Sequence, residues 1–340
     1  MELSTVWFGI IAVLFIGYFV LEGFDFGVGV LTKVLAHDDR ERRVLVNTIG
    51  PVWDGNEVWV LAAGGAMFAA FPEWYATLFS GFYLPLLIIL ASLIVRGVAF
   101  EYRAKRDNPT WRNRWDQAIF WGSLLPAFLW GVAFANIVRG VPLDADYEFV
   151  GTLWGLLNPY ALLGGLTTLG LFLIHGAAFV ALKTVGEIRA RARGFALQYG
   201  LLVAGVAVAF LGWTQVQHGN FWTAVLALIA ALSFLGGLFA IFMGSEGWSF
   251  FATAVTIGFA VIMLFVALYP DVMPTTLDDG ASLTVENASS TPYTLTIMTW
   301  VAVILTPIVL LYQGWTYWVF RKRIGTQHIP ESAPSSSSRQ

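Results

Sequence analysis

Two carboxylates and a carboxamide open an otherwise apolar stretch between Gly50 and Met67, which reads GPVWDGNEVWVLAAGGAM. Asp54 and Glu57 are three residues apart, so their side chains share one face of a helix. Asn56 lies between them. An ionisable group inside a bilayer is costly unless it has a partner or reaches water, and such groups typically transfer protons or form ion pairs. This cluster is the first candidate for a functional site.

Further ionisable residues lie in other apolar runs of the chain. Glu22 and Asp25 are also three residues apart, Arg96 lies in the third run, and Asp116 opens the fourth. At 1.5 Å per residue, Asp25 and Arg96 lie roughly 10 Å inside the basic residues that follow their runs. A guanidinium at this depth stays charged and needs a carboxylate. We therefore expect Arg96 to pair with Asp25 or Asp54.

One arginine cannot neutralise all of these acids. The remaining carboxyl groups must be protonated, hydrated or paired with a partner chain, and a buried carboxylic acid is suited to proton relay. The alternative is a static polar staple that holds the first four spans together. Both interpretations stay open for Asp25 and Arg96. For Asp54 and Glu57 we favour the relay, because they exceed the available countercharge.

The composition is that of an integral membrane protein. The chain has 340 residues, of which 57% are hydrophobic and 12% charged, and its mean hydropathy is +0.70, whereas soluble domains carry about 25% charged residues. The absence of cysteine excludes disulfides, thiolate metal sites, iron-sulfur clusters and cysteine nucleophiles. The net charge of −3 gives no sign of nucleic-acid binding. The first apolar run lacks a basic n-region and a cleavage site, so we expect a retained span.

Nine segments are long and apolar enough to cross a hydrocarbon core of about 30 Å. They cover residues 6–30, 51–70, 75–102, 116–138, 159–182, 195–215, 221–242, 250–269 and 293–320. Their length excludes barrel strands, so we predict an all-α polytopic fold. Residues 1–328 should form a single membrane domain, followed by a disordered cytoplasmic tail over 329–340.

Basic residues predict the orientation of the spans. With nine alternating spans, almost all of them fall on one side: Lys33, Arg40, Arg42, Arg43, Arg103, Lys105, Arg106, Arg112, Arg114, Lys183, Arg189, Arg191, Arg193, Arg321, Lys322, Arg323 and Arg339. The positive-inside rule then places the N-terminus outside and the C-terminus in the cytoplasm. The longest external loops, 139–158 and 270–291, are acidic and too short for a folded domain.

Histidine is too scarce for a haem held by two histidines. His175 is the only histidine inside a predicted span, no second axial ligand is available at its depth, and we interpret it as a packing residue. The chain contains no G-x-x-x-x-G-K-[ST], H-E-x-x-H or G-x-S-x-G motif. We therefore expect no catalytic residue, metal site or confidently assigned cofactor site in this chain by itself.

Local motifs predict two packing features. Asn158-Pro159 is typical of a helix start with an amide cap. Gly23 and Gly27, four residues apart, suggest close helix contact, as do Gly236, Ala240 and Gly244. The alternative is that glycine is simply common in membrane helices.

The chain resembles subunit II of the cytochrome bd-type quinol oxidases over nearly its whole length. The most diagnostic motif is W-D-G-N-[EQ]-V-W, present as WDGNEVW from Trp53, and G-F-D-x-G-V-G from Gly23 supports it. The longer similar stretches are EGFDFGVG (22–29), RERRVLVNTIGPVWDGNEVWVLAAGGAMFAAFP (40–72), SGFYLPLLIILASLIVRGVAFEYR (80–103), WRNRWDQAIFWGS (111–123), GVAFANIVRGVP (131–142) and MTWVAVILTPIVLLYQGW (298–315). Some relatives carry a larger external insertion near 218–221.

The resemblance implies a nine-helix subunit made of two four-helix bundles and a peripheral helix. Its partner would be a larger subunit I that holds haems b and d and the quinol site. Such a complex lies in the bacterial inner membrane, oxidises quinol, reduces dioxygen to water and takes protons from the cytoplasm. Some members also contain a structural quinone or a small single-helix accessory subunit.

The resemblance also implies roles for individual residues. Asp54 matches an acid on a proton path, and we add Glu57 to that path. Trp59 lies where some members line an oxygen route. Positions tied to complex integrity match Asp25, Arg96 and Asp116, and we place Glu22 and Asn56 in the same polar network at the inner leaflet. We therefore predict a haem-free oxidase subunit.

Two other functions remain compatible with intramembrane acids. A proton-coupled secondary transporter also uses acids and glycine-rich helices, but here the acids cluster near one face and no matching pair of broken helices is evident. A pure scaffold would require that every inner-leaflet acid be replaceable without loss of turnover.

Overall fold

The structure is a computed structural model that describes residues 2–329. The predicted tail over 329–340 lies outside the described residues except for Ile329. Within the described part, eight helices are long and apolar enough to span a membrane. These are α1 (Leu3–Leu35), α5 (Tyr83–Tyr102), α6 (Pro109–Arg139), α7 (Pro159–Lys183), α8 (Gly186–His218), α9 (Phe221–Phe242), α10 (Glu246–Leu268) and α11 (Pro292–Val319). The chain is thus an all-α polytopic membrane protein.

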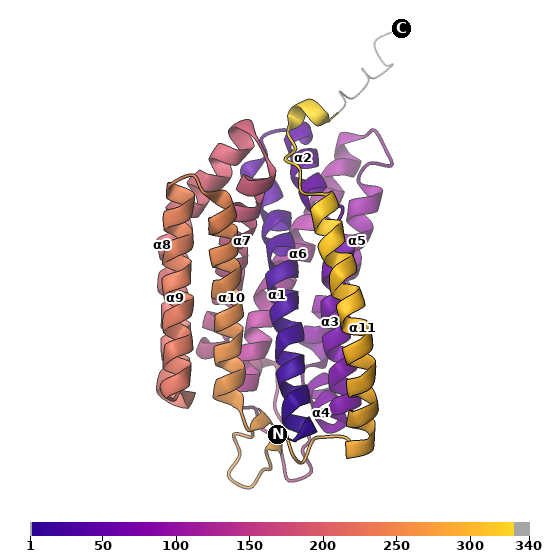
Figure 1. Cartoon of the computed structure of the whole chain (residues 1–340), viewed down its shortest axis with the longest axis vertical. Helices are drawn as coiled ribbons and strands as arrows, with labels where there is room; N and C mark the ends of the chain where they lie inside the picture. Colours follow the sequence, from indigo (N-terminus) through magenta and orange to yellow (C-terminus); the bar gives the residue numbers. More distant parts are fainter. Residues whose placement is uncertain (1, 330–340) are drawn as a thin grey trace.

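Three further helices complete the bundle. They are α2 (Asp39–Ile49), α3 (Trp53–Ala70) and α4 (Pro72–Gly81). Helix α3 lies among the long helices and parallels them (Figure 1). It covers the segment predicted as the second span, but its polar first turn keeps it out of the eight most apolar helices.

Helix α1 occupies the centre of the molecule. It packs against α3, α6, α7 and α10, while α8 and α9 lie at one edge and α11 lies on the outside next to α3 (Figure 1). The structure describes every residue of α11, and only Leu295 among them is buried. Helix α11 therefore meets the rest of the molecule through a few side chains rather than through a broad apolar face.

Glycine allows α1 and α7 to approach closely. A Cβ atom at Gly27 would collide with the carbonyl of Phe172 and lie 2.9 Å from Cα of Gly176, and one at Gly23 would lie 2.7 Å from the Phe172 ring. The predicted contact through Gly23 and Gly27 is confirmed. The second prediction, through Gly236, Ala240 and Gly244, is wrong for its two glycines, because no described residue lies within 4 Å of a Cβ placed at Gly236 and Gly244 lies beyond the end of α9.

Helix boundaries differ from the predictions at the start of α3 and within the third predicted span. Residues 75–102, predicted as one span, are divided at Phe82 into α4 and α5. Pro85 contributes to this division because it has no N–H to donate to the carbonyl four residues earlier. Pro51, predicted as a first helical residue, lies instead in a turn before Trp53.

Helix α2 was not predicted. Its residues lie between the first two predicted spans, and Asp38 caps the helix by accepting a hydrogen bond from the N–H of Glu41. Val44, Leu45 and Ile49 are buried on one side of α2. An amphipathic helix this short is missed by a search for apolar spans.

The two acidic loops, 139–158 and 270–291, contain short ordered elements. Strand β1 (Asp271–Met273) pairs antiparallel with β2 (Leu283–Thr284), and a short 3-10 helix, η1, covers Leu153–Leu156. The predicted cap before α7 is confirmed, because the side chain of Asn158 accepts a hydrogen bond from the N–H of Ala161. Neither loop forms a separate domain.

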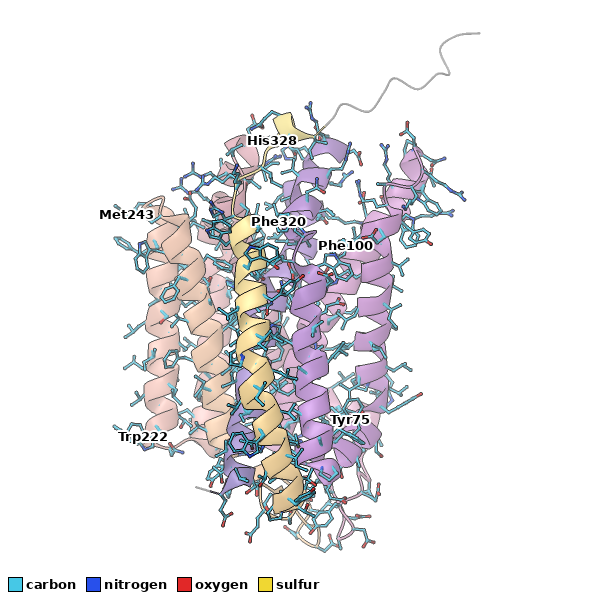
Figure 2. The ribbon with its side chains drawn as sticks, turned by 45° about the vertical axis from the view of Figure 1, so that its right-hand side comes forward. Tyr75, Phe100, Trp222, Met243, Phe320 and His328 are labelled. Carbon is cyan, nitrogen blue, oxygen red and sulfur yellow. The ribbon has the colours of Figure 1, made fainter. Side chains whose placement is uncertain are left out.

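The basic segments meet at one end of the bundle. Figure 2 shows Phe100, Met243, Phe320 and His328 near that end, and Tyr75 and Trp222 near the other. The C-terminal segment contains η2 (Thr326–His328). It joins this end through hydrogen bonds from Arg40 to the carbonyls of Thr326 and Ile329. We call it the basic end.

Candidate functional site

Arg96 of α5 lies at the centre of a buried ion-pair network. Its Nη2 atom donates to Glu22 of α1 and to Oε1 of Glu57 of α3, the latter at 2.6 Å. Arg96 and Glu22 are fully buried, whereas the side chain of Glu57 is 21% exposed. The guanidinium also lies over the ring of Phe26, 4.7 Å from its centroid. Three helices thus meet at one cation.

The predicted pairing of Arg96 with Asp25 or Asp54 is wrong. Asp25 lies about one turn along α1 from Glu22, beside α3, and its Oδ2 atom accepts a hydrogen bond of 2.6 Å from Nδ2 of Asn56. Residue spacing predicted the position of these groups along their helices. It did not give the rotation of α3, which turns Glu57 rather than Asp54 toward Arg96.

Asn56 links the acids to the outermost helix. Its Oδ1 atom accepts hydrogen bonds from the hydroxyl of Tyr317 at 2.7 Å and from Nε2 of Gln313 at 3.3 Å. Oε1 of Gln313 in turn accepts a hydrogen bond of 2.8 Å from the indole N–H of Trp59. Gln313 and Tyr317 belong to α11, so residues far apart in the sequence complete this network.

Asp54 lies apart from Arg96, in a groove between α3 and α11. The groove has a volume of about 590 Å³, and its walls include Asp54, Asn56, Gln313 and Tyr317. Asp54 is exposed, and its carboxylate accepts the N–H of Gly55 at 2.8 Å. The groove therefore brings an exposed acid and part of the buried network to one surface.

Acidic groups outnumber cations in this region. Glu22, Asp25 and Glu57 surround a single guanidinium. Several buried polar atoms have no partner among the described residues: Oε2 of Glu22, Oδ1 of Asp25, and Nε and Nη1 of Arg96. Buried polar atoms normally have a hydrogen-bond partner. This site thus has unused capacity for protons or water.

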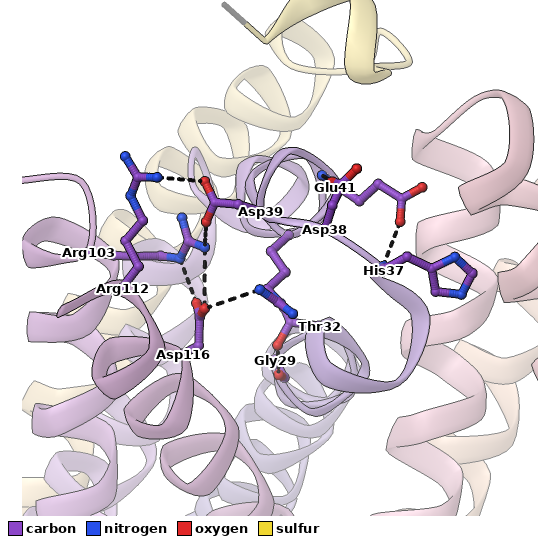
Figure 3. Close-up of polar contacts among 10 residues, drawn as sticks. Gly29, Thr32, His37, Asp38, Asp39, Glu41, Arg103, Arg112 and Asp116 are labelled. Carbon is purple, nitrogen blue, oxygen red and sulfur yellow. Dashed lines mark hydrogen bonds and ion pairs between the residues drawn. The ribbon is translucent and has the colours of Figure 1, made fainter. Parts of the chain in front are cut away.

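Asp116 belongs to a second cluster at the basic end, not to the network around Arg96 as predicted. Figure 3 shows Asp116 and Asp39 bound to Arg103, with Arg112 on the far side of Asp39. Nε of Arg103 lies 2.6 Å from Asp116, and its Nη2 lies 2.6 Å from Asp39. Burial of Arg103 lowers its pKa, but the hydrogen bond and charge of Asp116 outweigh this and raise the pKa above its usual value. This cluster joins α2, α5 and α6.

His175 is buried with both ring nitrogens engaged. Nδ1 lies 2.7 Å from the hydroxyl of Thr253, and Nε2 lies 3.0 Å from the carbonyl oxygen of Val20. The ring stacks on Phe250 with centroids 4.6 Å apart. These contacts leave no free nitrogen to bind a haem iron.

Across residues 2–329, no group of three or more His, Cys, Asp or Glu side chains is placed to hold a metal ion. The residues that sequence analysis missed are Tyr317, Arg103 and Asp39, and only Tyr317 had a signal, as a polar group in an apolar run.

Fold and site together define an all-helical, multi-pass membrane protein with a buried polar network in which carboxyl groups outnumber cations. The sequence profile of the family described as cytochrome bd terminal oxidase subunit II matches residues 3–320, and the chain belongs to this family. With its eight apolar helices and bacterial relatives, it is a multi-pass protein of the bacterial inner membrane.

Individual relatives agree with this assignment. The chain is 44% identical over 328 residues to the cytochrome bd ubiquinol oxidase subunit 2 of Bacillus subtilis (strain 168), covering 95% of this chain and 97% of that protein. It is 38% identical over 372 residues to the cytochrome bd-I ubiquinol oxidase subunit 2 of Escherichia coli (strain K12), covering 98% of each.

A solved structure has the same fold. The bd oxidase from Geobacillus thermodenitrificans gives a TM-score of 0.77 at 20% identity, covering 95% of this chain and 100% of that chain. At this identity the likeness concerns the fold alone.

Proposed function

We propose that the chain is the haem-free subunit of a quinol oxidase and that it delivers cytoplasmic protons to a larger, haem-bearing subunit I. Its relatives are named as ubiquinol oxidase subunits, and reduction of dioxygen to water consumes protons. Haems b and d and the quinol chemistry belong to subunit I in this proposal. The family assignment favours it over the transporter.

The observation that carries the proposal is the surplus of buried carboxyl groups around Arg96. A second carboxyl beside an ion pair in an apolar interior exchanges a proton more readily than it stays charged. Asp54 would take up protons from the groove. Glu57, three residues farther along α3 and thus about 4.5 Å along the helix axis, would pass them toward Glu22 and Asp25.

We also propose that α3 is a ninth span and that the basic end faces the cytoplasm. Eighteen residues extend about 27 Å, close to a hydrocarbon core of about 30 Å. The positive-inside rule then puts the N-terminus outside. In this orientation Asp54 opens toward the cytoplasmic side.

The two polar clusters, around Arg96 and around Arg103, would also stabilise the complex. Arg96 ties α1, α3 and α5 together, and Asp116 with Arg103 ties α5 to α2 and α6. Loss of either cluster would loosen the helices on which subunit I and its haems depend. A structural quinone, an accessory subunit and an oxygen route at Trp59 stay predictions.

The test compares Asp54→Asn and Glu57→Gln in the purified two-subunit complex. Both substitutions keep the shape and remove the proton-exchanging group. We expect quinol oxidation to fall by at least about tenfold while the haem spectrum is unchanged, since a positioned proton-transfer group contributes roughly a hundredfold or more. Glu73→Gln, an exposed acid at the start of α4, is the matched control. Full turnover in both variants would leave only the structural role.

A further inference from the structure

The hydrogen bonds around Asn56 form a chain with a fixed direction. The chain starts at the indole of Trp59, which can only donate. Gln313 must therefore turn its oxygen toward Trp59, so its NH2 group faces Asn56. Each amide in the chain then has only one favourable orientation.

The same hydrogen bonds determine which side of the Asn56 amide faces Asp25. Because Gln313 and Tyr317 both donate to Oδ1 of Asn56, its NH2 group points the other way, toward Oδ2 of Asp25 and the carbonyl of Leu21. Both donors and both acceptor positions of Asn56 are then occupied. A flipped amide would set two oxygens against each other at Asp25 and an N–H against an NH2 group at Gln313.

We propose that Trp59, Gln313 and Tyr317 are positioning residues that hold the Asn56 amide with its NH2 group toward Asp25. This inference rests on the proposed proton-transfer network and adds α11 to it. Helix α11 has little apolar contact with the bundle, yet it places two polar side chains on one buried amide. The role of Trp59 is thus to orient Gln313, which is distinct from lining an oxygen path.

Several charged groups lie around Asp25, so the hydrogen bond that it accepts influences whether its carboxyl group is protonated. Its carboxyl group interacts electrostatically with four charged side chains: Arg96 of α5, Glu22 of α1, and Glu57 and Asp54 of α3. Its second oxygen has no partner among the described residues. Asn56 is therefore the direct donor that the structure gives to Asp25, and its orientation decides whether that carboxyl accepts a hydrogen bond or must donate one.

The first experiment measures turnover of the two-subunit complex with Trp59→Phe and Tyr317→Phe. Tyr317→Phe keeps the ring and removes the hydroxyl donor, whereas Trp59→Phe replaces the indole with a smaller aromatic ring and removes the N–H donor. Trp300→Phe and Tyr293→Phe, at exposed positions of α11, are the matched controls. We expect Trp59→Phe and Tyr317→Phe to lower kcat at saturating oxygen by roughly fivefold, the factor that corresponds to about one net hydrogen bond. The KM for oxygen should not change.

The second experiment places the same substitutions in an Asn56→Ala background. If Trp59 and Tyr317 act through Asn56, they should cause no further loss there, whereas independent structural effects would multiply. If the Asn56→Ala complex does not retain its haems, Trp59→Phe is combined with Gln313→Leu instead. Multiplying losses or a change confined to the KM for oxygen would overturn the inference, as would turnover equal to that of the controls when Asp54→Asn and Glu57→Gln do lower turnover.

An infrared measurement separates this inference from the proposed function. The carboxyl band of Asp25 is assigned by its loss in Asp25→Asn. We expect it to shift in Trp59→Phe and Tyr317→Phe but not in their controls. A shift with full turnover in Asp54→Asn and Glu57→Gln would uphold the positioning role and reject the proton relay. An unshifted band would reject the positioning role, whatever the turnover.

Discussion

Removal of Arg96 would leave two buried carboxyl groups without their cation. Glu22 is fully buried and Glu57 largely so, and both face the same guanidinium. An intact buried ion pair adds little net stability, whereas a buried charge that loses its partner costs a great deal. The network should therefore tolerate paired changes better than single ones.

This asymmetry gives a prediction for Arg96→Leu. We expect it to destabilise the complex by about 3–5 kcal/mol, the usual cost of breaking a buried pair, seen as a lower midpoint of thermal haem loss. Adding Glu22→Gln should restore part of the midpoint, because one stranded charge is removed. Arg106→Gln, at an exposed arginine, is the control. An Arg96→Leu midpoint equal to that of the control would show that the pair contributes nothing.

Residue type and depth were predictable from the sequence, but partners were not. The apolar surroundings of Glu22, Asp25 and Arg96 indicated a buried polar cluster, and the structure contains one. The choice of Glu22 and Glu57 over Asp25 and Asp54 depends on how α1, α3 and α5 are rotated. Tyr317 lies 261 positions from Asn56, and no local pattern joins two such residues.

At the scale of elements, close packing of α1 on α7 depends on the missing side chain of Gly27. Its Cα faces Gly176, and the Phe172 carbonyl fills the space a methyl group would need. A backbone neighbour cannot move aside as a flexible side chain can. A side chain at position 27 is therefore tolerated less well than one at the other glycine positions of α1.

Gly27→Ala should separate α1 from α7. We expect a loss of about 1–3 kcal/mol from overpacking, measured as reduced yield and a lower thermal midpoint of the complex. Gly9→Ala is the matched control on the same helix, because nothing lies within 4 Å of a Cβ there. It should be neutral or slightly stabilising, since alanine favours helix by up to about 1 kcal/mol over glycine. Equal midpoints for the two variants would contradict this account.

The long apolar helices were predictable because their hydropathy alone specifies them. The elements that were not predicted depend on local backbone geometry or on tertiary contacts. The division between α4 and α5 follows from backbone geometry near Pro85, and α2 is stabilised by a cap at Asp38 and by burial of Val44 and Leu45. Neither feature changes the average hydropathy of a window.

At the scale of the whole molecule, ion pairs at the basic end connect parts that the membrane-embedded core leaves separate. Arg103 and Asp39 join α2 to α5, Glu41 and Arg191 join α2 to α8, and Arg323 with Glu246 joins the C-terminal segment to α10. These pairs are partly exposed, so each is worth about 1 kcal/mol or less. Their combined effect should depend on pH.

Glu41 gives the direction of that dependence. Partial burial raises its pKa, but hydrogen bonds from Arg191 and from the N–H of His37 outweigh this and hold the pKa below the usual 4.5. A lowered folded-state pKa means that the stabilisation is fully present above pH 4.5 and is lost as the pH falls through the folded value. We expect Glu41→Gln to lower the thermal midpoint at pH 7 and to have no effect once the native carboxylate is protonated. Glu187→Gln, an exposed acid on α8, should show no such convergence, and a pH-independent deficit in Glu41→Gln would assign the contact to packing rather than charge.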